Sequence, residues 1–199
     1  MHLHRISVAM HPHCYALRMP KRVDHEERRA EIDRAVWAII AEEGIAAATL
    51  RAIAARGGIS MGRVQHYFPT REAIVTHALT SYLALAERAH PVPDDRTDAL
   101  AMLLTHAIPR DGAQRLGAKV WYAYLAEAVT DAGVRAIVGE ALRGTEDLAT
   151  ELLDGDRDRA RQLLAAADGF AYRALIGVLT ADEADGAVRA LAGLSRASG

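Results

Sequence analysis

The 199-residue sequence is poor in cysteine and has no long hydrophobic run. A single cysteine, Cys14, excludes an internal disulfide and is typical of a reducing compartment. No apolar stretch approaches the roughly 20 residues that a membrane-spanning helix needs. The first residues also lack the apolar core and small-residue cleavage site of a secretory signal. We therefore expect a cytoplasmic protein.

Sequence signatures of the common enzyme classes are also missing. The chain has no nucleophile elbow, no phosphate-binding loop, no glycine-rich dinucleotide turn and no His-x-x-x-His metal spacing. We therefore expect neither an enzyme nor a bound cofactor. An all-α enzyme and a helical adaptor that does not bind DNA remain the alternative interpretations.

Residues 1–20 show neither a helical nor a strand period, and Pro12 and Pro20 interrupt them. We expect a disordered leader, and Met19 would make a natural alternative start. A metal site is not expected, because the spacing fits no structural zinc pattern and no second cysteine follows. The side chains that raise the question are His2, His4, His11, His13 and Cys14.

What the sequence does contain is helical periodicity throughout, with no alternating strand pattern. We predict an all-α protein of about nine helices. Asp24 and Glu27 have the form of a capping box at the start of the first helix, which Gly44 ends. The other predicted helices are two short ones within 49–68, a connector over 71–89, and body helices over 97–107, 112–129, from 130 to about 153, from 157 to about 179, and from 180 onward.

The stretch 49–68, TLRAIAARGGISMGRVQHYF, has the pattern of two short helices around a glycine turn. Thr49 can cap the first helix and Ser60 the second, while Gly57 and Gly58 break the pattern between them. A second helix with a polar face is the arrangement of a helix-turn-helix, whose second helix can lie in the major groove of DNA. An ordinary αα-corner would give the same local pattern.

Charge is distributed unevenly between the two parts of the chain. Residues 1–72 carry eleven Lys/Arg and eight Asp/Glu, a net charge of +3, whereas the remaining residues carry thirteen and eighteen, a net charge of −5. A mildly basic head on an acidic body is compatible with DNA binding, because phosphate contacts are local.

Residues 24–80 resemble the DNA-binding head of TetR-family (TetR/AcrR) transcriptional regulators. The resemblance rests on Ile53-Ala54, Gly58-Ile59-Ser60, Gly62, Tyr67-Phe68, Arg71-Glu72 and Ile74, in fixed register. Where family members often carry an aromatic residue three positions before the terminal Phe, this chain has Gln65. The rest of the chain is similar to the family's body only in helix number, helix lengths and a Trp-containing central helix.

The resemblance implies a homodimer that binds a near-palindromic DNA operator, most often as a repressor, and that a small molecule releases from DNA. It also implies a helix-turn-helix domain over 21–70 and a ligand-binding and dimerisation domain over 71–199 that includes the connector. Lys21 and Arg22 could form a flexible arm that reaches the minor groove, or could be a merely solvated pair.

Candidate DNA contacts are the polar or small residues of the second short helix and the hydroxyl and basic residues around it. Arg63 can pair with guanine and Gln65 with adenine. The full set is Thr49, Ser60, Met61, Gly62, Arg63, Gln65, His66, Tyr67 and Arg71.

Aromatic residues gather in the middle of the body, where they could line a ligand cavity or simply pack in the core. At 100° per residue, Trp121, Tyr122 and Tyr124 cannot all share one helix face. The full set of candidate ligand contacts is His106, Trp121, Tyr122, Tyr124, Leu125, Phe170, Tyr172 and Arg173. We expect the last two helices to form a four-helix dimer interface, although they could also pack within one subunit.

Overall fold

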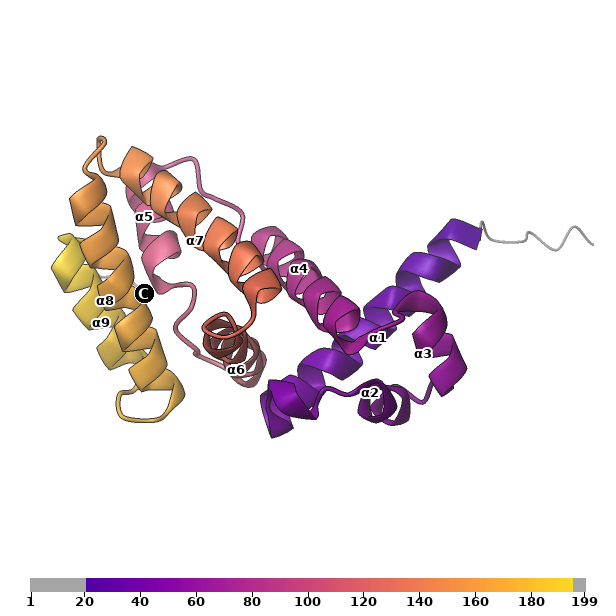
Figure 1. Ribbon diagram of the computed structural model, residues 1–199. Coiled ribbons are helices and arrows are strands. Elements are labelled where there is room, and N and C mark those ends of the chain that lie inside the picture. Colours follow the sequence, from indigo (N-terminus) through magenta and orange to yellow (C-terminus); the bar gives the residue numbers. More distant parts are fainter. Residues whose placement is uncertain (1–20, 195–199) are drawn as a thin grey trace, which may run out of the picture.

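The computed structural model describes residues 21–194, and these form nine α-helices and one short 3₁₀ helix with no strand (Figure 1). The helices are α1 (Lys21–Glu43), α2 (Leu50–Arg56), α3 (Met61–Tyr67), α4 (Arg71–Ala89), α5 (Arg96–Thr105), α6 (Gly112–Glu127), α7 (Ala132–Leu152), α8 (Arg157–Leu175) and α9 (Ala181–Ala192), and η1 (Ile45–Ala47) lies between α1 and α2. The predicted all-α architecture is confirmed. Within the described residues, no helix is long and apolar enough to cross a membrane. The leader and its histidines lie outside these residues.

Polar side chains cap the starts of several helices, and those of Thr49 and Ser60 do so as the sequence predicted. The hydroxyls of Thr49, Ser60 and Thr70 accept hydrogen bonds from backbone N–H groups in the first turns of α2, α3 and α4. Thr180 and Glu183 form a complete capping box at the start of α9. Because a helix leaves its first N–H groups without internal partners, these caps satisfy donors that would otherwise need water.

Two predicted helix boundaries are wrong. The α1 helix begins at Lys21, so Asp24 lies inside it and is not its cap. The α8 helix ends at Leu175 and not near Leu179, because Gly177 adopts the left-handed conformation (φ 78°) and reverses the chain.

The head packs around one hydrophobic core that also includes part of the body. Ile32, Val36 and Ile39 of α1 contact buried residues of α2, α3 and α4, and the same cluster continues into Tyr124 of α6 and Val134 of α7. The core therefore crosses the 70/71 boundary of the predicted domains. A second core joins α5, α8 and α9 at the end of the molecule far from α2 and α3 (Figure 1).

The α4 helix is tied to its neighbours by side chains that hydrogen-bond its backbone or extend from it. Trp37 of α1 donates to the carbonyl of Ala78 at 2.9 Å, and the buried hydroxyl of Tyr124 donates to the carbonyl of Val75 at 2.9 Å. In the opposite direction, the hydroxyl of Tyr82 donates to the carbonyl of Gly117 on α6 at 3.1 Å. These bonds hold α4 between the head and α6.

One carboxylate lies inside the head core. Asp33 of α1 is only 3% exposed, and its Oδ2 lies 3.5 Å from Nε2 of His77 on α4. Its Oδ1 has no hydrogen-bond partner among the described residues. Burial raises the pKa of Asp33 above its usual value, although a hydrogen bond from Ser81 and the charge of His77 act in the opposite direction.

Candidate DNA-binding surface and ligand groove

The α2 and α3 helices form a helix-turn-helix. Gly58 takes a positive φ of 61° in the turn, a conformation that glycine adopts without steric penalty. Ile59 follows it and packs against the head core. The turn and the two capped helices therefore have the arrangement that the sequence predicted.

The α3 helix is fixed by one face and exposed on the other. Val64 is fully buried in the head core, and Phe68 just after the helix is also buried. These two residues orient the helix so that its remaining polar side chains face solvent. The predicted contacts Met61, Gly62, Arg63, Gln65 and His66 are all exposed.

Arg63 and Gly62 are unconstrained by the rest of the described structure. Only the backbone N–H of Arg63 is used, by the Ser60 cap, and its guanidinium makes no ion pair or hydrogen bond with the residues described. A methyl group added at Gly62 would meet no atom within 4 Å. The packing of the fold therefore requires neither the guanidinium of Arg63 nor a glycine at position 62.

The other candidate phosphate contacts have structural roles as well. The hydroxyls of Thr49 and Ser60 serve as caps, and each keeps an O–H that can be donated to a phosphate oxygen. Arg71, half-buried at the start of α4, donates to the carbonyl of Ile45 in η1 at 2.7 Å. Tyr67 is partly buried, with its ring edge-on to that of His66.

Lys21 and Arg22 are the first residues of α1 and do not form an extended arm. Of the two alternatives given for this pair, the flexible arm is contradicted by the helical backbone.

The body aromatics do not converge on one cavity. Tyr124 is buried in the head core, Trp121 stacks against Tyr82 of α4, and Tyr122 packs edge-on against Tyr172 of α8. These three directions follow from the 100° rotation between successive helical residues. The remaining candidates are also dispersed: Leu125 packs on the head core, Phe170 on the second core, and the exposed Arg173 donates to the carbonyl of Gly169.

A groove in the body lies elsewhere, between the end of α4, α5, the start of α6 and α9. It has a volume of about 470 Å³ and opens to solvent. Of the predicted ligand contacts, only His106 lines it. The lining residues are His90, Met102, Thr105, His106, Arg110, Gln114, Asp182, Asp185 and Arg189. Its walls are therefore mostly polar and charged, and not aromatic as predicted.

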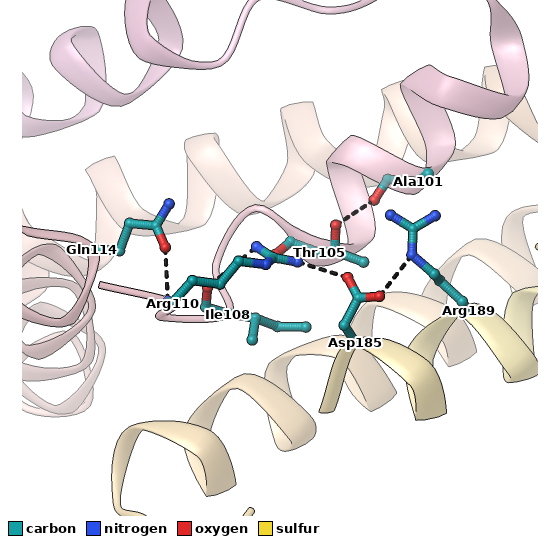
Figure 2. Close-up of polar contacts among 7 residues, drawn as sticks. All are labelled: Ala101, Thr105, Ile108, Arg110, Gln114, Asp185 and Arg189. Atoms are coloured by element: carbon teal, nitrogen blue, oxygen red, sulfur yellow. Dashed lines mark hydrogen bonds and ion pairs between the residues drawn. The ribbon is translucent and has the colours of Figure 1, made fainter. Parts of the chain in front are cut away.

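Asp185 holds two arginines on one side of this groove. Its Oδ1 accepts from the guanidinium of Arg110 at 2.6 Å and its Oδ2 from Nε of Arg189 at 2.8 Å. Figure 2 shows Asp185 between the two guanidinium groups. Arg110 also donates to the carbonyl of Thr105 at 3.2 Å, which fixes the loop between α5 and α6.

Two histidines meet at the same groove, with their ring centres 5.3 Å apart. Nδ1 of His90 lies 3.0 Å from the carbonyl of Ala86, and Nδ1 of His106 lies 2.9 Å from that of Leu103. A carbonyl only accepts, so each Nδ1 carries the proton. Burial lowers the pKa of His106, so its imidazole is neutral at neutral pH.

Sequence reasoning missed most of this groove. Asp185 and Arg189 are spaced as an i, i+4 ion pair on one helix, which is a readable signal. Nothing local connects that pair with Arg110 or His90, which come from distant parts of the chain. Among the described residues, no group of three His, Cys, Asp or Glu side chains is placed to hold a metal ion.

The helix-turn-helix with its exposed polar face, the connector helix and the larger helical body together define a DNA-binding transcriptional regulator. The profile of the family described as "Bacterial regulatory proteins, tetR family" matches residues 34–78. The HTH-type transcriptional regulator PksA of Bacillus subtilis is 29% identical over 176 residues, which cover 79% of this chain and 83% of PksA.

Solved structures agree with the sequence comparison. A transcriptional regulator from Rhodococcus sp. Rha1 superposes with a TM-score of 0.77 at 26% identity, covering 83% of this chain and 94% of that one. The multidrug binding protein EbrR, solved with ethidium, gives a TM-score of 0.63 at 26% identity, covering 82% and 98%. The family model, the curated relative and the solved structures all support a transcriptional regulator of the TetR family. Its family and relatives are regulators and not enzymes.

Proposed function

We propose that this regulator is a cytoplasmic repressor that binds a near-palindromic operator as a homodimer and leaves it when a small molecule binds the body. The observation that carries DNA recognition is the orientation of α3. Val64 and Phe68 fix the helix in the core, while Arg63 and Gln65 project from the exposed face with chemistry that suits guanine and adenine.

Exposed apolar side chains on α8, on α9 and on the segment between them support the homodimer. Tyr172, Ile176, Val178 and Leu191 are between 47% and 64% exposed although they are large and apolar. Exposed apolar patches are typical of protein interfaces. A two-fold contact through α8 and α9 would bury this patch and place two α3 helices at a fixed separation, as successive major grooves require.

Release by a ligand is supported by the groove in the body and by the likeness to EbrR, which was solved with ethidium. The groove lies against the end of α4, and the start of α4 lies directly after the recognition helix. A ligand that favours one position of α4 over another would therefore change the spacing of the two heads. Coupling free energies of about 1–3 kcal/mol are typical of such linkage.

Selection from random double-stranded DNA tests the proposal. The full chain should enrich a two-fold-related sequence, and its affinity for that sequence should fall steeply as salt rises, since phosphate contacts release counterions. Enrichment of no symmetric sequence would contradict operator binding as a dimer. A salt-independent affinity would contradict recognition through the DNA backbone.

A further inference from the structure

Arg189 lines the groove, and only part of its guanidinium group is hydrogen-bonded. Its side chain is only 16% exposed, and its Nε is bound to Asp185. Within the described residues, its two terminal nitrogens have no hydrogen-bond or ion-pair partner. They point away from Asp185 in Figure 2.

Unpaired terminal nitrogens of a guanidinium group are suited to binding a carboxylate. The two N–H groups at the end of the fork are parallel and can donate to both oxygens of one carboxylate. A mostly buried guanidinium is less screened by water than a surface one, so such a pair is stronger here than on an exposed helix. Asp185 holds the fork in position but takes only Nε.

We propose that the groove binds a small organic carboxylate, with Arg189 as the anchoring cation. This inference rests on the proposed ligand-responsive function and names the chemical class of its effector. A monoanion fits better than a phosphate dianion, because the carboxylates of Asp182 and Asp185 also line the groove and would repel a second negative charge.

Other lining residues suit the rest of such a molecule. Met102 offers a flexible apolar surface. His90 and His106 use Nδ1 on backbone carbonyls, which leaves the Nε2 edge of each ring for a hydrogen-bond donor on the ligand. An organic cation such as ethidium, which EbrR was solved with, would instead meet the positive charge of Arg189.

Thermal unfolding of the full chain with benzoate and hexanoate tests the proposal, with the neutral isosteres benzamide and hexanamide and with inorganic phosphate as comparisons at matched ionic strength. At least one carboxylate should raise the unfolding midpoint, whereas its amide and phosphate should not. Arg189→Gln should abolish the rise. Arg143→Gln, an arginine exposed on α7 outside the groove, should keep it.

A second variant changes binding in the opposite direction and separates recognition from damage to the fold. Asp182→Asn removes a negative charge of the groove wall without touching the carboxylate that holds Arg189, so the ligand carboxylate should bind severalfold more tightly by calorimetry. Three outcomes would each overturn the proposal: no carboxylate effect beyond that of its amide, an equal effect on Arg189→Gln, or weaker binding to Asp182→Asn.

Operator binding, measured by fluorescence anisotropy in the same samples, separates this inference from the proposed function. Carboxylate binding without any change in operator affinity would leave the anion site standing and reject release by the ligand. Operator binding by a chain that no carboxylate stabilises would leave the regulator standing and reject the carboxylate site.

Discussion

Arg63 is the residue whose replacement should act most directly on base recognition, since its guanidinium is exposed and has no partner in the described part of the chain. Arg63→Ala should relax the base preference at one position in each half-site and cost about 1–3 kcal/mol of binding there. Binding to a library of single-base operator variants measures this. A uniform loss across all sequences would instead indicate a phosphate contact.

Replacing Gly62 by alanine should stabilise the fold but weaken operator binding. Alanine there meets no atom of the protein and improves helix propensity, so Gly62→Ala should stabilise the fold by up to about 1 kcal/mol. If α3 enters the groove as proposed, the added methyl group should weaken operator binding. Gly144→Ala, on α7 and equally free of neighbours, should stabilise without affecting DNA binding.

Asp33 should make stability depend on pH. Its pKa is raised by burial, so the native state holds this proton more tightly than the unfolded chain does. Its contribution is therefore most favourable below the unfolded value of 3.8 and is lost as pH rises through the folded pKa. Asparagine does not ionise, so Asp33→Asn avoids that loss. The thermal unfolding midpoint of the variant should therefore rise relative to that of the wild type as pH increases from acid to neutral. A gap between the two proteins that does not change with pH would contradict this.

Residue-scale prediction succeeded where the signal is local. Thr49 and Ser60 were identifiable as caps because a cap bonds to backbone only three residues away. Arg71 was expected at phosphate and is bound to the carbonyl of Ile45, a contact across 26 residues that no local pattern encodes.

At the scale of elements, the buried hydrogen bond from Tyr124 of α6 to Val75 of α4 should contribute more to stability than the exposed bond from Tyr122 to Asp168. Tyr124→Phe removes a buried hydroxyl donor and should cost about 1 kcal/mol of unfolding free energy. Tyr122→Phe removes a solvent-accessible bond to the carbonyl of Asp168 and should cost less. Urea unfolding of the two variants compares them, and equal losses would contradict the tie between α4 and α6.

The number and order of the helices were predictable because apolar periodicity and helix-breaking residues are local features of the sequence. The groove proposed to bind the ligand was not predictable, since it joins α4, α5, α6 and α9 across about a hundred residues. The aromatic cavity was inferred from composition, whereas the direction of each ring depends on its helix phase. Trp121, Tyr122 and Tyr124 consequently face three different neighbours.

At the scale of the whole molecule, the proposed dimer depends on the apolar patch of α8 and the segment after it. Ile176→Lys places a charge where the partner would pack, so light scattering should show a monomer and operator affinity should fall. Val129→Lys alters an apolar residue that is 75% exposed outside the patch and should remain dimeric. An Ile176→Lys protein that stays dimeric would place the interface elsewhere.

The family and its all-α architecture could be recognised from the head motif alone, because a helix-turn-helix is compact in sequence. How the head joins the body could not, since the shared core depends on long-range packing of Tyr124 and Val134 against α1 and α4.

That shared core has a consequence for building hybrid regulators. A head cut out at residue 70 would leave the packing partners of α1 behind on α4, α6 and α7. Exchanging whole heads between relatives would therefore create mismatched surfaces at the centre of each subunit. A regulator with a new operator preference and an unchanged ligand response is better made by exchanging only the exposed side chains of α3, such as Arg63, Gln65 and His66, and keeping the core residues Val64 and Phe68.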